Sequence, residues 1–327
     1  MSFTLTVLGS SSALPTATTN PTAHLLKADE RFFLIDCGEG TQMQLRRNHV
    51  KIQRIHHVFI SHLHGDHYFG LIGLITTMQL LGRVKTLHIY SPPGLKAIIE
   101  LQRRPYNHYE NGDGNEIENT SSDKTSKKED DYFPIIFHEL ETRKNTVIFD
   151  DNKISVETIP LKHRIPCCGF LFREKPKLRK ILPEMILKHK ISIEQIQKIK
   201  LGENLQKEDG TIITNEEITL PALDSESYAF CSDTRFNESI IPIIKGVDLL
   251  YHEATFLHEL EHLAKKTAHS TALQAATIAM KAEVKQLIIG HFSARYKNKD
   301  VLLNEAKTVF ENTVVAEEGK TYSPTNQ

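Results

Sequence analysis

The most informative stretch of the chain is HLHGDH, residues 62–67. It places three imidazoles and one carboxylate within six residues, directly after an apolar segment. Histidine and carboxylate are natural ligands of Zn²⁺. Because alternate side chains of an extended segment point the same way, His62 and His64 can hold one ion. The turn that follows can direct Asp66 and His67 towards a second ion, so the motif predicts a two-metal site.

Two metal ions need more ligands than these four, and the chain offers three further candidates. They are His163, Asp233 and His291. Each follows the end of a short apolar segment that predicts a strand, the place where α/β enzymes collect their functional residues. A carboxylate such as Asp233 can bridge two ions with its two oxygens.

Outside these residues, short apolar segments alternate with segments of helical periodicity. The expected strands are 3–8, 32–36, 57–61, 87–90, 146–149, 154–160, 228–231, 248–251 and 286–289. The expected helices are 42–47, 69–81, 93–101 and 271–281, with Thr41 and Ser270 as N-caps. This alternation predicts a layered α/β fold. We expect residues 1–327 to form one domain.

Two segments depart from this pattern. Residues 110–131 hold a single apolar residue, Ile117, and we expect a mobile polar insertion there. Residues 173–222 read as lysine-rich helical sequence and a polar turn. Their first part, 173–200, has nine Lys and Arg against three Glu, whereas the rest of the chain has 31 against 38. The near-neutral total therefore conceals one basic segment.

Composition excludes several classes of protein. The net charge of -1 excludes a wholly basic nucleic-acid binder, although not a local basic patch. The sequence contains no run of 18 apolar residues, so no membrane span is predicted. The first residues do not have the pattern of a signal peptide. The four cysteines include no C-x-x-C pair, which favours free thiols. We expect a cytoplasmic protein without a membrane partner.

Eight short motifs resemble one known family and occur in that family's order. They are LGSSSALP (8–15), DCGEGTQ (36–42), ISHLHGDH (60–67), PLKHRIP (160–166), SDTR (232–235), HEATF (252–256), HST (269–271) and HFSARY (291–296). The H-x-H-x-D-H pattern with downstream His, Asp and His resembles the metallo-β-lactamase superfamily. The other motifs resemble its short-form tRNA 3′-processing endoribonucleases, ribonuclease Z. The resemblance implies a four-layer αββα sandwich with an inserted basic arm.

The resemblance also implies a ligand set for two Zn²⁺ per subunit. One ion takes His62, His64 and His163, the other takes Asp66, His67 and His291, and Asp233 bridges them. Two zinc ions lower the pKa of a shared water towards neutrality and stabilise the charge that develops during phosphoryl transfer. Asp66 is expected to orient or deprotonate that water.

Further residues receive roles from the same resemblance. His269 would contact the scissile phosphate and protonate the leaving 3′ oxygen, unless it serves only to cap the next helix. Glu253 would hold His269 in the right tautomer. Arg235 and Arg295 are candidate phosphate contacts, although either could pair with a surface carboxylate instead.

The implied activity is removal of the 3′ trailer from precursor tRNA, which leaves a 3′-hydroxyl on the tRNA and a 5′-phosphate on the trailer. Residues 173–222 would form an arm that grips the tRNA body through phosphate contacts, in a homodimer. The Gly-Pro pair of the family's arm is absent from this chain. A basic hairpin without an RNA role is the simpler alternative for this segment.

Three other functions remain open at this stage. A metal-dependent phosphodiesterase acting on small or cyclic nucleotides would use the same ligands and would not need the arm. A tRNA-binding protein with an inactive site would belong to another class. Residues 258–262 read HELEH, which matches the H-E-x-x-H pattern of zinc proteases. We interpret them as a solvated helix with its histidines on the polar face, because the protease hypothesis leaves residues 62–67 unexplained.

Overall fold

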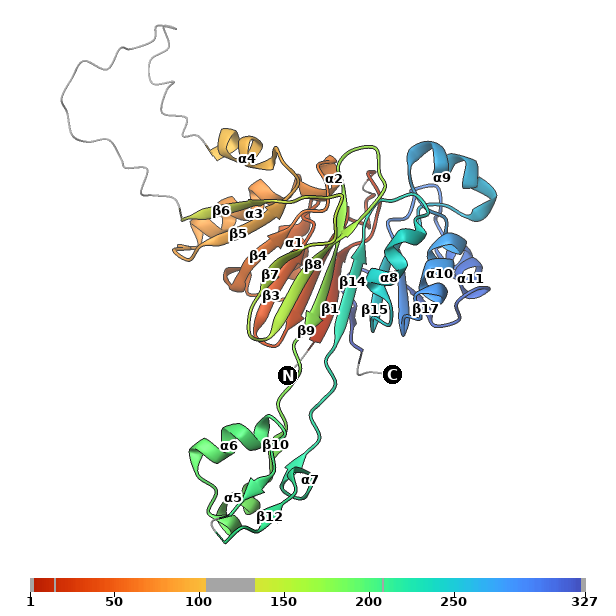
Figure 1. Cartoon of the computed structure of the whole chain (residues 1–327). Helices are drawn as coiled ribbons and strands as arrows, with labels where there is room; N and C mark the ends of the chain where they lie inside the picture. Colours follow the sequence, from red (N-terminus) through yellow and green to blue (C-terminus); the bar gives the residue numbers. More distant parts are fainter. Residues whose placement is uncertain (1–2, 15, 104–132, 208, 325–327) are drawn as a thin grey trace, which may run out of the picture.

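The computed structural model describes residues 3–14, 16–103, 133–207 and 209–324. In this part of the chain two seven-stranded sheets pack face to face, and helices cover both outer faces (Figure 1). The expected insertion at 110–131 lies outside the described residues. No described helix is long and apolar enough to cross a membrane.

The first sheet has the order β18-β1-β2-β3-β4-β5-β6. Its strands are β1 (Phe3–Gly9), β2 (Ala23–Ala28), β3 (Arg31–Ile35), β4 (Ile55–Phe59), β5 (Leu87–Ser91), β6 (Ile135–Glu139) and β18 (Thr321–Tyr322). Strands β3 to β6 run parallel. The helical elements of this half are α1 (Thr41–Arg47), η1 (Ile52–Arg54), α2 (Gly65–Tyr68), α3 (Leu71–Leu80) and α4 (Leu95–Arg103).

The second sheet has the order β17-β16-β15-β14-β9-β8-β7. Its strands are β7 (Val147–Asp150), β8 (Ile154–Pro160), β9 (Cys168–Glu174), β14 (Ser227–Cys231), β15 (Leu249–Glu253), β16 (Gln286–Gly290) and β17 (Thr313–Val315). Strands β14 to β17 run parallel. The helical elements of this half are η3 (Glu238–Ile240), α8 (Ile241–Ile244), η4 (His258–Leu260), α9 (Glu261–Thr267), α10 (Ala272–Lys281) and α11 (Asp300–Lys307).

Three hydrophobic clusters separate the four layers. Between the sheets, inward-facing aromatic side chains interlock, as where Phe59 meets Phe170 and Phe172 at ring-centroid distances of 5.3 and 5.4 Å. A second cluster lies under α1, α3 and α4, and a third lies under α8, α10 and α11. Each sheet therefore buries both of its faces, and the expected αββα sandwich is confirmed.

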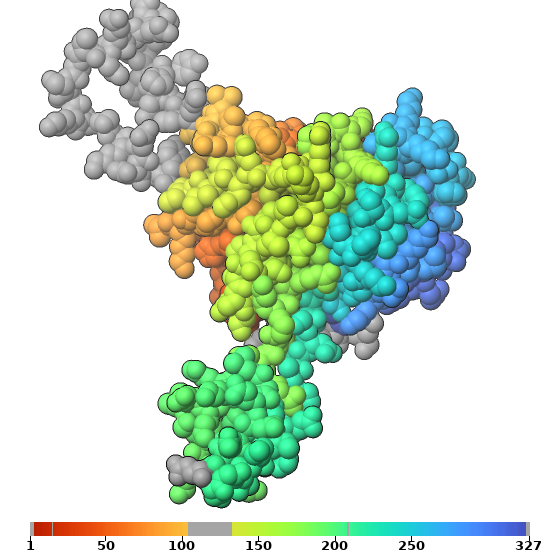
Figure 2. Space-filling view, in the orientation of Figure 1, coloured from red at the N-terminus to blue at the C-terminus, as the bar shows by residue number. Residues whose placement is uncertain are grey.

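Residues 175–226 form an arm that stands apart from the sandwich (Figures 1 and 2). Its elements are β10 (Lys180–Ile181), α5 (Pro183–His189), α6 (Ile193–Lys200), β11 (Leu205–Gln206), β12 (Ile212–Ile213), α7 (Asn215–Ile218) and β13 (Thr219–Leu220). The arm has a small apolar core of its own, centred on Ile199 and Ile218. Strand β9 continues through Glu174, so the first two residues of the expected segment 173–222 belong to the sheet.

Charge is distributed unevenly along the arm. The basic residues are concentrated in 173–200, which includes α5 and α6. Residues 201–222 carry one Lys against five Asp and Glu. The α5–α6 side of the arm therefore supplies its positive charge.

Two expected helix caps differ in the structure. Gly40, with φ 82°, caps α1, and the Thr41 hydroxyl donates instead to the Gly38 carbonyl at 2.6 Å. Thr271 caps α10 through a reciprocal pair of hydrogen bonds with Gln274. The Ser270 hydroxyl donates to the Thr234 carbonyl, so it is not free to cap the helix. Helix α1 thus begins at a left-handed glycine that makes no side-chain cap bond, whereas α10 begins at an extended threonine that makes a capping box.

Candidate metal centre and active site

The site forms where strands of both sheets end. His62 and His64 follow β4, Asp233 follows β14, and His291 follows β16. His163 lies in the connection from β8 to β9. Parallel strands of one sheet present their carboxyl ends at the same edge, and packing the two sheets brings both edges together.

Close backbone contacts shape the loops around the site. A Cβ atom on Gly38 would lie 2.5 Å from the carbonyl oxygen of Asp66, so only glycine lets these two loops meet. Asp36, Ala268 and His291 have φ values of 54°, 61° and 58°. This left-handed conformation is costly for residues other than glycine, and it clusters at functional sites.

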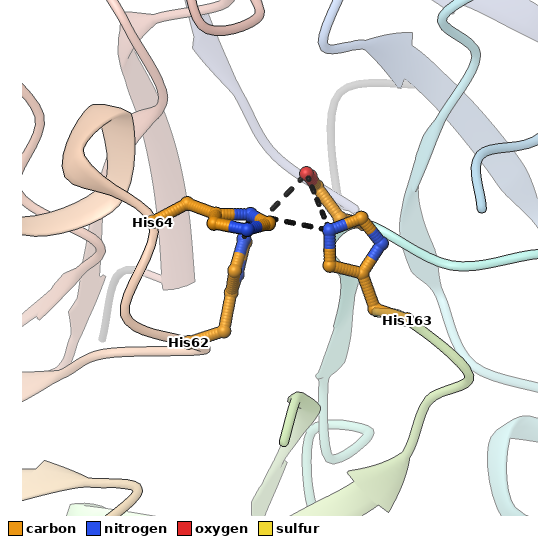
Figure 3. A group of neighbouring side chains, drawn as sticks. His62, His64 and His163 are labelled. Atoms are coloured by element: carbon orange, nitrogen blue, oxygen red, sulfur yellow. Dashed lines mark hydrogen bonds and ion pairs between the residues drawn. The ribbon is translucent and has the colours of Figure 1, made fainter. Parts of the chain in front are cut away.

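Three histidines converge on one side of Asp233 (Figure 3). Nδ1 of His64 lies 3.0 Å from Nε2 of His62 and 3.2 Å from Nε2 of His163. Oδ2 of Asp233 lies 3.6 Å from Nε2 of His62 and 3.7 Å from Nε2 of His163. A tetrahedral Zn²⁺ with bonds of about 2.0–2.1 Å places its ligand atoms roughly 3.3 Å apart, so these spacings fit one ion.

The remaining candidate ligands converge on the other oxygen of Asp233. Oδ1 of Asp233 lies 3.1 Å from Nε2 of His291 and 3.5 Å from Nε2 of His67. Oδ2 of Asp66 lies 3.2 Å from Nε2 of His67 and 3.6 Å from Nε2 of His291. The two oxygens of Asp233 thus face two separate groups of ligands, which is the geometry of a bridging carboxylate.

Three polar atoms of the second group have no hydrogen-bond partner within the described part of the protein. Nε2 of His67, Nε2 of His291 and Oδ1 of Asp233 are buried without a hydrogen bond. Leaving such atoms unpaired is costly, and a bound cation removes that cost for all three. The donor set therefore fits a divalent metal ion.

Residues of the first half of the molecule contact Nδ1 of His62 and His67, on the side of each ring away from the ligand nitrogen. The buried Asp36 carboxylate accepts a hydrogen bond from Nδ1 of His67 at 2.7 Å. It also accepts from the Ser61 hydroxyl at 2.9 Å, and that hydroxyl lies 3.0 Å from Nδ1 of His62. These bonds orient Nε2 of both rings towards the metal centre. Asp36 and Ser61 lie in motifs that are recognisable in the sequence, but the sequence predicted no role for either residue.

The second half repeats this arrangement around Glu253. Its Oε1 accepts from Nδ1 of His269 at 2.9 Å, as expected from the sequence. Its Oε2 accepts from the Thr255 hydroxyl at 2.7 Å, and that hydroxyl lies 3.0 Å from Nδ1 of His291. The backbone N–H of Thr234 also donates to Oε1. The sequence did not identify Thr255 as part of the site.

Burial and the nearby carboxylates act in opposite directions on the imidazoles. Burial disfavours the charged form of His269, but the Glu253 and Asp233 carboxylates outweigh it and raise the pKa of His269 to about 9. Burial opposes charge on His67 as well, yet Asp233, Asp36 and Asp66 raise its pKa well above the ordinary value. His269 is therefore protonated at neutral pH.

The acids of the centre are ionised for a related reason. Burial raises the pKa of Asp66, but the neighbouring His67 and His291 imidazoles outweigh it and hold the pKa far below its usual range. The same balance, dominated among the attractions by His291 and His67, keeps the pKa of Asp233 low. Ionised carboxylates are the form that a metal ion requires.

The two candidate arginines lie at the rim of the site. Arg235 is exposed and lines a cavity of about 420 Å³ together with His163. The same cavity contains Arg143, Lys162 and Arg164, which the sequence had not indicated as contacts. The Arg295 guanidinium lies 5.0 Å from the centre of the Phe256 ring. Among the described ion pairs, neither candidate arginine is matched with a carboxylate.

The H-E-x-x-H pattern does not form a metal site in the described residues. His258 lies in η4 and His262 in α9, both exposed, and neither belongs to the three His/Asp groups able to hold an ion. His269 belongs to one of those groups, with Asp233 and His291. Its Nδ1 is already bound to Glu253, so that nitrogen is not free as a ligand.

Comparisons with known proteins agree with this geometry. Residues 3–179 match the family model described as Anti-Pycsar protein Apyc1. Ribonuclease Z of Bacteroides thetaiotaomicron is 46% identical over 316 residues, covering 97% of this chain and 93% of the relative. Ribonuclease Z of Cytophaga hutchinsonii is 45% identical over 323 residues, covering 98% of this chain and 96% of the relative.

Two solved structures share the fold across almost the whole chain. Human tRNase Z, short form, superposes with a TM-score of 0.65 at 26% identity and covers 98% of each chain. The metallo-β-lactamase fold protein YhfI from Bacillus subtilis superposes with a TM-score of 0.64 at 19% identity, covering 98% of this chain and 99% of that one.

The αββα sandwich is a metallo-β-lactamase fold, and its paired His/Asp groups have the arrangement of a metal site. The chain belongs to the ribonuclease Z family and, through residues 3–179, to the family that the Apyc1 model describes. Hydrolytic endoribonuclease activity is the class of chemistry that this family carries.

Proposed function

We propose that this protein is a zinc-dependent endoribonuclease that removes 3′ trailers from precursor tRNA. Cleavage leaves a 3′-hydroxyl on the tRNA and a 5′-phosphate on the trailer. The observation that carries the proposal is the placement of His269, which is hydrogen-bonded to Glu253, beside two ligand groups that share Asp233. The near-complete alignment with proteins named ribonuclease Z supports the substrate.

The proposed centre holds two Zn²⁺ per subunit. One ion is assigned to His62, His64 and His163, the other to Asp66, His67 and His291, and Asp233 is assigned to both. When bound, the ions supply a nucleophilic water near neutral pH and neutralise charge that develops on the phosphoryl oxygens. Zinc fits better than Mg²⁺ because five of the seven ligands are imidazoles.

Asp66 serves the attacking side of the reaction. Its side chain is only 8% exposed, and its low pKa keeps the carboxylate ionised. An ionised carboxylate here accepts a hydrogen bond from the attacking water and orients it. Asp66 therefore acts both as a ligand and as a catalytic residue.

His269 serves the leaving side. Glu253 occupies Nδ1 of His269, which leaves the other ring nitrogen to carry a proton towards the substrate. As water attacks phosphorus, the bond from phosphorus to the 3′ oxygen breaks, and His269 gives its proton to that oxygen. The tRNA thus acquires its 3′-hydroxyl, and the trailer keeps the phosphate.

Positive charge beside the centre supports RNA binding. Arg143, Lys162, Arg164 and Arg235 line the cavity that borders His163. Clustered Lys and Arg bind phosphates without reading base sequence. We assign this cavity, with Arg295, to the RNA backbone on either side of the cleaved bond.

We further propose that the arm binds the tRNA body. It leaves the sheet at the end of β9 and returns at the start of β14, whereas His163 precedes β9 and Asp233 follows β14. The arm and the metal centre therefore lie at opposite ends of this pair of strands (Figure 1). The arm contacts RNA far from the cut, and four exposed lysines on or next to α5 and α6 carry that contact, at positions 188, 190, 198 and 200.

A homodimer would place one subunit's arm near the other subunit's site. Large apolar side chains are exposed at the end of α3, with Leu80 at 83%, Leu81 at 53% and Val84 at 82%. Exposed apolar groups of this kind favour association. On this ground we propose a homodimer. We also propose that the protein is cytoplasmic, since the four cysteines are free as well as buried. Light scattering checks the oligomer, and mixing an armless with an inactive subunit checks exchange of arms.

The test of the function is cleavage of a 3′-extended precursor tRNA by zinc-loaded protein. The Asp66→Ala variant and a variant without residues 178–222 are assayed alongside. We expect a cut near the mature 3′ end, lost in Asp66→Ala and weakened mainly in binding without the arm. The end groups are read by ligation and phosphatase sensitivity.

The same experiment discriminates the phosphodiesterase alternative. Cyclic nucleotides and a small phosphodiester are assayed with the parent and with the armless protein. Hydrolysis of these compounds without any cut in precursor tRNA would keep the metal centre and reject the substrate. If the metal-loaded parent protein binds tRNA but cleaves none of these substrates, the proposal that it is an enzyme is wrong.

A further inference from the structure

The side chain of Thr255 lies between the Glu253 carboxylate and the His291 imidazole. Its hydroxyl lies 2.7 Å from Oε2 of Glu253 and 3.0 Å from Nδ1 of His291. Oε1 of the same carboxylate receives Nδ1 of His269 at 2.9 Å. The buried Glu253 carboxylate therefore binds the proposed proton donor His269 directly, and it contacts the proposed metal ligand His291 through the Thr255 hydroxyl.

The direction of these hydrogen bonds follows from counting protons. The Thr255 hydroxyl has one proton, and the ionised Glu253 has none to give, so Thr255 donates to Glu253. The carbonyl of His291 is also 3.0 Å away, but the bond to the charged oxygen is the stronger one. Nδ1 of His291 must then donate to Thr255. This tautomer leaves the lone pair of Nε2 facing Asp66 and Asp233.

The first half of the molecule has the same arrangement of one carboxylate, one hydroxyl and two imidazoles. Ser61 lies 2.9 Å from the Asp36 carboxylate and 3.0 Å from Nδ1 of His62. Asp36 also holds Nδ1 of His67 directly at 2.7 Å. Each half thus uses one buried carboxylate for two imidazoles, one of them reached through a hydroxyl.

We propose that Thr255 is a positioning residue that relays the Glu253 carboxylate to His291 and thereby fixes this imidazole as a ligand for one of the two metal ions. The proposal rests on the two-metal centre proposed above. Removing the hydroxyl leaves Nδ1 of His291 buried without a partner, so the ligating tautomer loses its support. The neighbouring ion, held by His62, His64 and His163, does not depend on Thr255.

The hydrogen bonds allow this role to be separated from that of Glu253. In Thr255→Val the side chain keeps its shape, and Oε2 of Glu253 keeps the backbone N–H of residue 255 at 3.2 Å. Oε1 keeps His269 and the backbone N–H of Thr234. The variant therefore removes support from His291 while the proton donor stays paired.

The test is a zinc titration of metal-free full-length protein against a chromophoric chelator. We expect two ions in the parent and, in Thr255→Val, one ion of parental affinity and one weakened about 10–100-fold. Thr255→Ser keeps the hydroxyl and restores the second ion. In a His291→Ala background, adding Thr255→Val changes nothing more, whereas adding Ser61→Ala weakens the remaining ion.

Several outcomes would overturn the inference. Parental affinity for both ions in Thr255→Val would do so, as would a failure of Thr255→Ser to restore binding. An added loss when Thr255→Val is combined with His291→Ala would show that Thr255 acts elsewhere. A parent that binds fewer than two ions would instead reject the two-metal centre, so the two failures are distinguishable. Thermal unfolding of the metal-free proteins checks the fold, and Thr255→Ala replaces the valine variant if that variant does not fold.

Discussion

The metal centre and the arm are built in opposite ways. In the centre, Asp233, His62 and His67 are almost fully buried, and Ser61 and Asp36 fix the direction of the two imidazoles through Nδ1. In the arm, a few apolar residues form a small core under exposed lysines. Rigid, buried groups suit chemistry, where small displacements are costly, whereas mobile surface charges suit phosphate binding. The difference predicts that substitutions in the centre affect kcat and substitutions in the arm affect KM.

The largest effect is expected for Asp233→Ala, which removes the carboxylate shared by both ligand groups. The proposed metal ions would contribute several kcal/mol of transition-state stabilisation, so kcat should fall by roughly 10³-fold or more. Steady-state kinetics and metal analysis measure the loss, and filter binding measures tRNA affinity. Asp300→Ala, an exposed acid on α11, is the control. Equal losses of tRNA affinity and kcat in Asp233→Ala would show that catalysis and binding are not divided between the centre and the arm.

A loss of about 10²–10⁴-fold in kcat is expected for His269→Ala, the range for removal of a general acid. The pKa of His269 is raised to about 9, so the imidazole carries its proton below that pH and loses it above. The activity of the parent should therefore decline as pH rises through about 9. In Glu253→Gln the carboxylate that raises this pKa is gone, and the decline should move to lower pH. If the decline in activity at alkaline pH is unchanged in Glu253→Gln, the assignment of that decline to His269 is wrong.

A smaller effect, confined to binding, is expected when four arm lysines become alanine at positions 188, 190, 198 and 200. KM should rise while kcat is kept. For each RNA phosphate that the arm no longer neutralises, the dependence of log affinity on log salt should flatten by about 0.7–0.9. Alanine at Lys96 and Lys307, which lie on the sandwich, is the control for removal of positive charge elsewhere. A salt dependence equal to that of the parent would show that these lysines do not touch RNA.

The smallest effect on activity is expected for Ile199→Ala in the arm core. Ile199 is 1% exposed, and truncating such a side chain costs about 2–5 kcal/mol. That loss should appear as faster proteolysis within the arm, with an unchanged unfolding temperature of the sandwich. Leu201→Ala, at a residue 72% exposed, should leave the arm intact. If the sandwich and the arm lose stability together, they form one cooperative unit.

The proposed ligands were accessible from sequence because their signals are local. His62, His64, Asp66 and His67 lie within one motif, and the other ligands follow recognisable strands. The structure brings all seven together in two groups. Strands β2 (Ala23–Ala28) and β9 (Cys168–Glu174) were not predicted. Both are buried on both faces, so their sequences lack the alternation that marks a strand.

The supporting residues were not accessible in the same way. Thr255 and His291 are 36 residues apart, and Ser61 is an ordinary serine in the sequence. Positive φ at Asp36 and His291 also has no sequence signal, because glycine is the residue that marks such positions.

The amino-acid sequence alone was sufficient for the α/β fold class, for proposing the ligand residues and for locating the basic segment, because periodicity, short spacing and charge are properties of neighbouring residues. Pairing of neighbouring strands within each sheet was needed to place Asp36, Ser61 and Thr255 behind the imidazoles, whereas the contact of Glu253 with His269 was expected from the family resemblance. Strand pairing was also needed to set the arm at the far end of β9 and β14 from the metal centre. Hydrogen bonds between distant segments depend on where strands end in space, and no local pattern encodes that.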